Sequence, residues 1–345
     1  MPPWKPNRSR TSRQWFPTGR ISVDTPRRSD NDTEMRVFAI SDVHTDFKEN
    51  LHLLAGLPTR SYRDDALMLA GDVSDNLTVL RSTFAILLER FRYVFFVPGN
   101  HELWIRKGEY KHSLEKFQDV LRLCESLGVR TAPECVGRGP DRVCIVPLFS
   151  WYTRPEEGSD SLFRERPLDG PASALWSDDY LVKWPSEFRP AQYFCDLNKG
   201  RVGEGLEATR ISFSHFVPRA DLMFASPDEP PPLWPDPHER DFNFSQVAGS
   251  TLIEDQVRRL GSRLHVYGHQ HRNRSRHHEG VWYVSNCLGY LEERERRSVR
   301  NPTTVVQPVW PLEELRGTEQ SRRVREVSTG STTGDGRFGS TTTPT

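Results

Sequence analysis

The chain has 345 residues and a formal net charge of zero at pH 7, from 47 basic and 47 acidic side chains. This length suffices for one large domain or two ordinary ones. The balanced charge gives no general attraction to nucleic acid or to an anionic membrane. The longest apolar runs, such as YVFFV at 93–97, are far shorter than a membrane-spanning helix. We therefore expect a soluble protein that has neither a membrane nor a nucleic-acid partner.

Predicted strands and helices alternate through most of the chain. Apolar runs bounded by glycine and polar residues predict strands at 35–41, 65–71, 92–97, 142–149, 209–216, 263–269 and 280–286. Apolar residues at helical spacing predict helices at 46–57, 76–91, 113–128 and 252–261. This alternation predicts an α/β layered fold with parallel strand pairing.

Three segments depart from this pattern. Residues 1–34 form an expected disordered arm, whose first 23 residues carry five basic and no acidic side chains. Residues 301–345 form an expected low-complexity tail, mostly disordered, because fourteen of the last 18 residues are Ser, Thr or Gly. We therefore place one domain at 35–300, with an irregular insertion rich in aromatic residues at about 151–205.

The cysteines and the basic arm bear on the compartment. The five cysteines form no C-x-x-C pair, so we expect reduced, mostly structural thiols and a cytoplasmic location. The basic arm has the charge bias of an organelle transit peptide, which leaves an organellar location as the alternative.

Polar side chains follow five of the predicted strands at the point where each strand ends. Ligands of α/β proteins gather at the carboxyl ends of strands. Imidazole, carboxylate and amide oxygen together suit divalent Zn, Mn or Fe. The candidate ligands outnumber what one ion needs, so they predict two ions; they are Asp42, His44, Asp72, Asn100, His215, His269 and His271.

These strand ends read D-x-H, G-D-x-x-D, G-N-H-E, S-H and G-H-x-H, in that order, between Asp42 and His271. The series resembles the calcineurin-like metallophosphoesterase superfamily. The resemblance implies a four-layer α/β/β/α sandwich with two metal ions at the strand ends. It also implies that Asp72 bridges the ions, and that the remaining ligands divide into Asp42, His44 and His271 for one ion and Asn100, His215 and His269 for the other.

The resemblance further implies how the site would act. A hydroxide that bridges the two ions would attack the phosphorus of a phosphoester. His101 matches the family histidine that protonates the leaving group. Asp75 matches the aspartate that orients this histidine in the phosphoprotein-phosphatase branch. Taken alone, Asp75 is equally well explained as a loop cap. For His101 the alternative is an additional group around the metals.

The chain departs from the named branches of this superfamily. Serine/threonine phosphoprotein phosphatases keep arginines where this chain has Asn76 and Pro98. Purple acid phosphatases have a tyrosine where Asp75 stands, and Mre11-like nucleases usually have an aspartate where Glu102 stands. We therefore expect a metal-dependent phosphoesterase of another branch. A phosphodiesterase or nuclease and a non-catalytic metal-binding scaffold are the alternatives.

Three further residues are candidates for substrate contacts. Arg219 follows the strand end at His215 and could bind a phosphate oxygen. Trp104 and Arg106 follow His101 closely. For each, packing at the protein surface is an equally good explanation. We expect a phosphorylated substrate, and the sequence leaves its class, the native metals and the oligomeric state open.

Overall fold

A computed structural model describes residues 35–106, 108–139, 142–166, 176–202, 208–225, 242–296 and 305–311. These residues belong to one unit of the chain, which begins at Glu34. The predicted basic arm at 1–34 lies outside the described residues, as does the predicted tail at 301–345 except for 305–311. Among the helices described, none is long and apolar enough to cross a membrane.

The first sheet has the strand order β10-β1-β2-β3. Its parallel strands are β1 (Val37–Ile40), β2 (Ala66–Leu69) and β3 (Tyr93–Phe96), and β10 (Gln307–Trp310) pairs antiparallel with β1. The helices that follow the parallel strands are α1 (Lys48–Ala55), α2 (Leu77–Leu88) and α3 (Ser113–Leu127). Because β10 comes after residue 300, the sheet extends past the domain end expected from sequence. A four-residue edge strand that contains a proline is too short to give a periodic signal.

The second sheet has the order β4-β5-β6-β7-β9-β8. Its parallel centre consists of β5 (Val143–Pro147), β6 (Thr209–Phe213), β7 (Leu264–Val266) and β9 (Val281–Ser285). The antiparallel edges are β4 (Glu134–Val136) and β8 (Arg274–His278). The remaining helices are α4 (Asp178–Leu181), α5 (Pro190–Leu197), α7 (Thr251–Leu260) and α8 (Leu291–Glu295), with short 3-10 turns at η1 (His101–Leu103), η3 (Ala220–Met223) and η4 (Phe244–Gln246).

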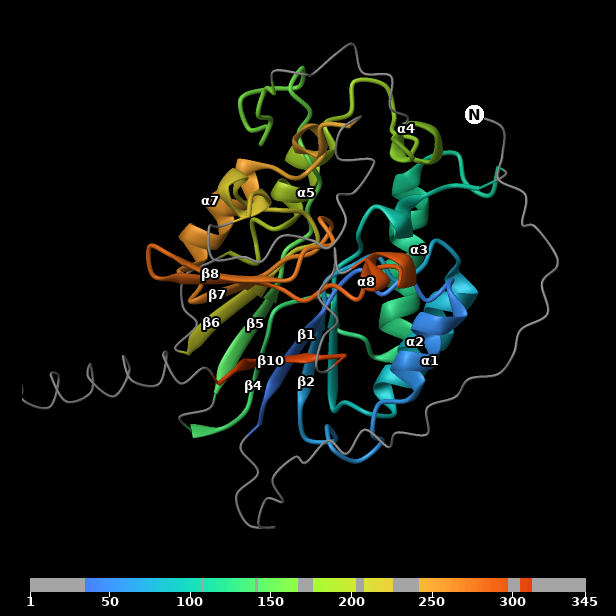
Figure 1. Ribbon diagram of the computed structural model, residues 1–345, viewed down its shortest axis with the longest axis vertical. Coiled ribbons are helices and arrows are strands. Elements are labelled where there is room, and N and C mark those ends of the chain that lie inside the picture. The colour runs from blue at the N-terminus through green and yellow to red at the C-terminus, as the bar shows by residue number, and fades with distance from the viewer. Residues whose placement is uncertain are drawn as a thin grey trace, which may run out of the picture. The chain divides into compact units, whose positions relative to one another are not determined.

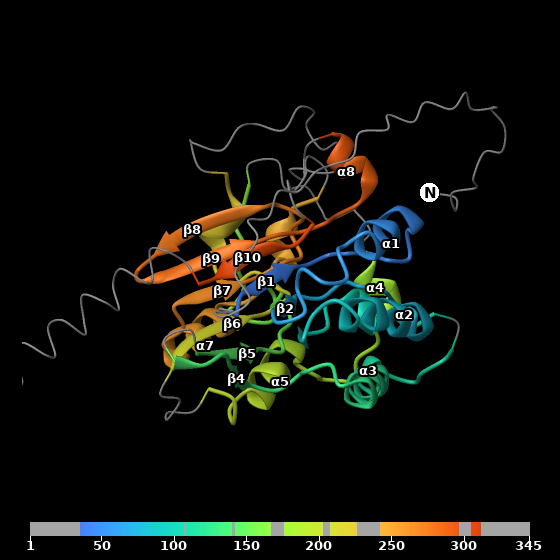
Figure 2. The same ribbon diagram turned by 90° about the horizontal axis from the view of Figure 1, so that it is seen from below.

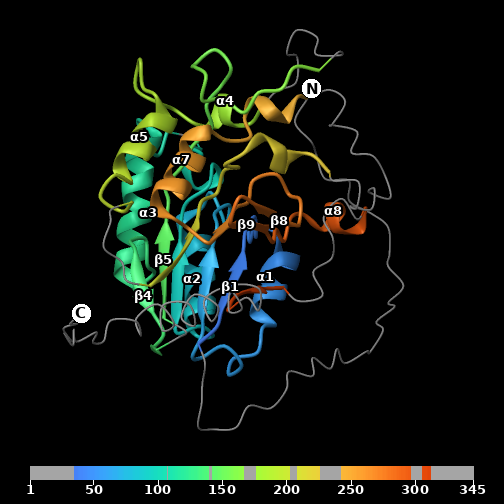
Figure 3. The ribbon, with the colours of Figure 1, turned by 90° about the vertical axis from the view of Figure 1, so that its left-hand side faces the viewer.

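Alternate residues of the strands belong to different cores. Val37 and Ala39 of β1 join the core between the two sheets. Phe38 and Ile40 of the same strand join a second core beneath α1, α2 and α3. A third core lies between the second sheet and α7, and includes Val257. Figure 1 shows α1, α2 and α3 on one side of the strands and α5 and α7 on the other. Figure 2 again shows α1, α2 and α3 together beside the strands, and Figure 3 views the molecule from the side of α5 and α7. The predicted α/β/β/α layering is confirmed.

One expectation about the cysteines is wrong. Cys135 and Cys144 lie opposite each other on β4 and β5 and are joined by a disulfide. Cys124, Cys195 and Cys287 are free thiols. The sequence did not reveal the pair because β4 has only three residues, too few for an alternating pattern to predict the pairing.

Replacing Phe95 by alanine should lower the free energy of unfolding by about 3–5 kcal/mol, because its ring is lost from a packed core. Phe95 lies on β3 in the core between the sheets, with 0% of its surface exposed. Urea unfolding measures the change. The control is Phe224→Ala, at a site where the ring is 52% exposed and the effect should stay within about 0.5 kcal/mol. Equal unfolding midpoints for the two variants would contradict this assignment of the core.

Candidate metal centre

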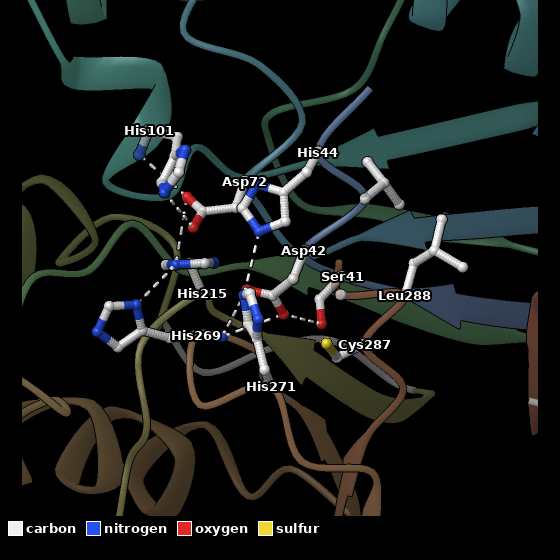
Figure 4. A network of polar contacts seen from close by, with 12 residues as sticks. Ser41, Asp42, His44, Asp72, His101, His215, His269, His271, Cys287 and Leu288 are labelled. Carbon is white, nitrogen blue, oxygen red and sulfur yellow. Dashed lines mark hydrogen bonds and ion pairs between the residues drawn. The ribbon is translucent and has the colours of Figure 1, made fainter. Parts of the chain in front are cut away.

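The predicted ligands lie just after the carboxyl ends of five strands, drawn from both sheets. Asp42 and His44 follow β1, Asp72 follows β2 and Asn100 follows β3, while His215 follows β6 and both His269 and His271 follow β7. In Figure 4 the labelled carboxylates and imidazoles point toward one another. The structure therefore brings the seven side chains together, although some are more than two hundred residues apart in the chain.

The side chains form two adjoining groups. In the first, His44 Nε2 lies 3.1 Å from His271 Nε2, which lies 3.5 Å from Asp42 Oδ1. In the second, His215 Nε2 lies 3.2 Å from Asn100 Oδ1 and 3.2 Å from His269 Nδ1. Asp72 is within reach of both, since its Oδ1 is 3.4 Å from His215 Nε2 and its carboxylate also groups with His44. This is the position expected of a carboxylate shared between two ions.

The histidine tautomers test whether this donor set fits a metal. His215 Nδ1 donates to the carbonyl of Ala70, and His269 Nε2 donates to the carbonyl of Val247. His271 Nδ1 donates to the carboxylate of Glu293 at 2.8 Å. In the neutral rings of His215 and His269 the nitrogen that faces the site then carries no proton, so their lone pairs face one another across 3.2 Å. A cation between them removes this repulsion, and the outer partners are those that metal-binding histidines require.

The ionisation of these groups fits the same conclusion. Burial lowers the pKa of His44, His215 and His269, which favours the neutral rings that metals bind. Burial also acts to lower the pKa of His271, but the carboxylates of Glu293 and Asp42 outweigh it and raise this pKa well above its ordinary value, a shift that a cation at the site would oppose. Burial and the nearby carboxylates of Glu102 and Asp42 raise the pKa of Asp72 well above its ordinary value. A divalent cation between the two groups would reverse that shift and keep the carboxylate ionised.

The backbone at these positions is strained. Seven non-glycine residues of the described chain have a positive φ, and five of them are predicted ligands: Asp42 (50°), His44 (40°), Asp72 (55°), His269 (70°) and His271 (51°). Each such conformation costs about 1–3 kcal/mol and persists only when the surrounding structure holds it. Gly99 relieves part of the crowding, because a Cβ there would lie 2.2 Å from Asp72 Oδ1. Such concentrated strain is typical of a functional site.

Glu102 contributes to the site in a way the sequence analysis missed. It is 0% exposed, and its carboxylate accepts hydrogen bonds from four backbone N–H groups. Three belong to the loop after β2, at Asp72 (3.0 Å), Val73 (2.6 Å) and Ser74 (3.0 Å), and the fourth belongs to Gly99 (2.7 Å). Glu102 therefore joins the loop that carries Asp72 to the loop that carries Asn100. Its place in the G-N-H-E motif was the available signal.

The residues around His101 differ from the expectation. Its ring stacks on Trp104 at 3.6 Å between centroids, and its Nε2 lies 3.7 Å from Asp72 Oδ2. Asp75 does not contact His101 in the described part of the chain; it pairs with the guanidinium of Arg106. The structure thus gives Asp75 a different partner, and the orientation of His101 by Asp75 stays a prediction. The turn η1 directs the backbone N–H of His101 to Asp72. The carboxylate of Asp75 is instead occupied by the guanidinium of Arg106.

Two other positions have structural partners. The guanidinium of Arg219 is held by Asp221 and by Glu254 of α7, both at 3.0 Å, so the structure does not bring Arg219 to the candidate ligands. Asn76 caps α2 by accepting from the backbone N–H of Thr78 at 2.8 Å. The position that holds an arginine in the phosphoprotein phosphatases thus serves as a helix cap here.

A family model described as calcineurin-like phosphoesterase matches residues 35–273. The chain belongs to the calcineurin-like phosphoesterases. The enzyme class predicted from the motifs, a phosphoric ester hydrolase, is therefore confirmed. This family uses divalent metals, and the three overlapping groups of histidine and carboxylate side chains provide places for them.

Two records of PptH, a curated sequence and a crystal structure, are similar to this chain over most of its length. One curated relative is the [acyl-carrier-protein] phosphodiesterase PptH of Mycobacterium tuberculosis, 28% identical over 274 residues, which cover 76% of this chain and 81% of the relative. The crystal structure of the phosphopantetheinyl hydrolase PptH from the same organism has a TM-score of 0.61 and 24% identity, and the match covers 81% of this chain and 98% of that one. The likeness confirms the fold. It also agrees with the prediction that this calcineurin-like phosphoesterase is not a typical serine/threonine phosphoprotein phosphatase.

Replacing Glu102 by glutamine should destabilise the protein by about 1–3 kcal/mol, because the amide NH2 would face backbone N–H donors that lose their acceptor. Thermal unfolding of the metal-free protein measures the effect. Glu89→Gln is the matched control, since its side chain is 72% exposed. A Glu102→Gln protein as stable as the control would show that the carboxylate does not hold the two loops.

Proposed function

We propose that this calcineurin-like phosphoesterase cleaves a phosphodiester at a centre of two divalent ions, and that its substrate is an acyl carrier protein bearing phosphopantetheine. The observation that carries the first part is the set of nitrogen and oxygen ligand atoms that converge at the strand ends, with the unprotonated nitrogens of His215 and His269 and the amide oxygen of Asn100 within 3.2 Å of one another in turn. The relation to PptH, over most of both chains, supports the carrier-protein substrate.

The groups around the candidate ligands favour a diester over a monoester. Near neutral pH a phosphomonoester carries up to two negative charges, whereas a phosphodiester carries one. The two positions that hold arginines in the phosphoprotein phosphatases are the helix cap Asn76 and the neutral Pro98. The guanidinium of Arg106 is already paired with Asp75. A substrate of lower charge is therefore better matched to the residues present.

The candidate ligands fall into two sets, one for each ion. Asp42, His44 and His271 would hold one ion, and Asn100, His215 and His269 the other, with Asp72 reaching both. Ions bound in this way supply an activated water and neutralise charge on the phosphoryl oxygens. Glu293 would keep His271 in the required tautomer through its hydrogen bond to Nδ1.

His101 would donate a proton to the leaving oxygen. Burial lowers the pKa of His101, and the histidines nearby lower it further, so the ring is neutral in the free protein. An anionic phosphodiester beside the ring would raise this pKa and allow it to carry a proton. Trp104 would keep the ring in place through the stacking contact.

Assays with Mn²⁺, Zn²⁺ or Fe²⁺ should show release of phosphopantetheine from a holo acyl carrier protein, detected by intact-protein mass spectrometry. Bis(p-nitrophenyl) phosphate should also be cleaved faster than p-nitrophenyl phosphate. Asp72→Asn should reduce activity to that of metal-free protein, whereas Asp64→Asn at an exposed position should not. Faster cleavage of the monoester would overturn the diester assignment. Cleavage of the synthetic diester without release from the carrier protein would overturn the substrate.

His101→Asn should slow hydrolysis of esters with alkyl leaving groups by about 10²–10⁴-fold, since these need a proton from a general acid. Esters with a p-nitrophenolate leaving group need little protonation and should lose much less. The control is His277→Asn, at an exposed position of β8. Equal losses for both kinds of ester would show that His101 has another role.

A further inference from the structure

A buried carboxylate in the aromatic-rich insertion lies directly behind the candidate ligands. Asp178 begins α4 and is 3% exposed. Its Oδ1 accepts hydrogen bonds from Asn100 Nδ2 at 3.0 Å and from Trp104 Nε1 at 2.6 Å. Its Oδ2 accepts from Trp176 Nε1 at 2.9 Å and from the hydroxyl of Tyr152 at 3.1 Å. All four partners are donors.

Both oxygens of Asp178 are occupied by these donors. A carboxylate has about four lone-pair positions, so the four donors fill them all. A proton on either oxygen would displace one of the donors. Asp178 therefore acts only as an acceptor in this arrangement, which restricts the groups that can face it.

That restriction decides which way the amide of Asn100 points. Nδ2 must face Asp178, because Oδ1 in its place would be repelled by the carboxylate. Oδ1 then faces His215 Nε2 at 3.2 Å, inside the second group of candidate ligands. In the reverse orientation the NH2 group would point into the site, where it cannot bind a metal ion. Asp178 thus selects the orientation in which Asn100 can act as a ligand.

The same oxygen, Asp178 Oδ1, also binds a side chain that packs against His101. Trp104 Nε1 donates to it, and the indole ring of Trp104 stacks on His101. The α4 segment is fixed to this part of the chain by backbone contacts. Ile105 N donates to the carbonyl of Leu181, and Ser113 N donates to the carbonyl of Lys183. Figure 1 shows α4 close to one end of α3, and Ser113 is the first residue of that helix.

We propose that Asp178 is a positioning residue, which holds the oxygen of Asn100 toward the metal centre and keeps Trp104 against His101. This inference rests on the proposed metal centre. It assigns a role to the insertion, from which the chain takes Tyr152, Trp176 and Asp178. The metal that depends on Asn100 should then be sensitive to Asp178, while the ion held by Asp42, His44 and His271 should not be.

The test compares Asp178→Asn with Asp179→Asn in the full-length protein. Asp179 is the neighbouring residue, its side chain is 45% exposed, and it pairs with Arg154. Isothermal titration of metal-free protein with Mn²⁺ should show one of two binding events weakened by about 10–100-fold in Asp178→Asn. At Mn²⁺ concentrations that saturate the wild type, electron paramagnetic resonance should show loss of the spin-coupled pair. Asp179→Asn should match the wild type in both measurements.

Tyr152→Phe separates positioning from a purely structural role. It removes a donor to Oδ2 and leaves the contact between Asp178 Oδ1 and Asn100. It should lower the melting temperature of the metal-free protein but leave both Mn²⁺ binding events unchanged. The proposal is overturned if Tyr152→Phe and Asp178→Asn weaken the same binding event equally, or if Asp178→Asn binds both ions as the wild type does.

Asn100→Asp gives an answer even if Asp178→Asn does not fold. A carboxylate is ordinarily a stronger ligand than an amide for a divalent cation, so this variant should bind Mn²⁺ more tightly if Asp178 plays no part. With Asp178 3.0 Å from the position of Nδ2, the two carboxylates repel each other, and binding should weaken instead. Tighter binding would overturn the proposal. A wild-type protein that binds fewer than two Mn²⁺ ions would overturn the proposed metal centre itself.

Discussion

Four hydrogen bonds to one buried carboxylate, that of Glu102, hold together the loops on which this site is built. The bonds come from backbone N–H groups after β2 and β3. Asp72 adopts a positive φ in one of these loops, and Asn100 immediately precedes the turn η1 in the other. Neither loop has the repeating backbone bonds of a helix or strand at this point. An acceptor that satisfies four donors at once gives both loops a defined conformation.

Asn100 lies between two buried carboxylates with different tasks. Glu102 binds the backbone next to it, through Gly99, and Asp178 binds its side-chain amide. Glu102 fixes the position of the backbone beside Asn100, and Asp178 determines which atom of the Asn100 amide faces His215. The insertion that carries Asp178 is therefore part of the site's construction. Its aromatic residues also shield these polar contacts from water, which strengthens them.

The residues that distinguish this chain from the phosphoprotein phosphatases form a consistent set. Asn76 completes the first turn of α2, and Asp75 is paired with Arg106. The donor set of the metal centre is retained, while positive charge for a doubly ionised phosphate is reduced. This combination agrees with the proposed cleavage of a phosphodiester, in which metal ions rather than arginine side chains would neutralise most of the substrate's charge.

The sequence by itself determined the order of the strands and helices and the seven candidate ligands. Apolar periodicity and strand-end motifs involve only residues close together in the chain, so both can be recognised from the sequence alone. The tertiary structure decided the partners of those ligands. Glu293 reaches His271 across 22 residues, and Asp178 reaches Asn100 across 78. It also decided that Asp75 faces Arg106, that Cys135 meets Cys144, and that β10 completes a sheet begun 270 residues earlier at β1 (Val37 to Gln307). Such contacts depend on how the layers pack and on which groups reach the same carboxylate. These long-range arrangements leave no pattern in the neighbouring residues of the sequence, so they could not be predicted from it.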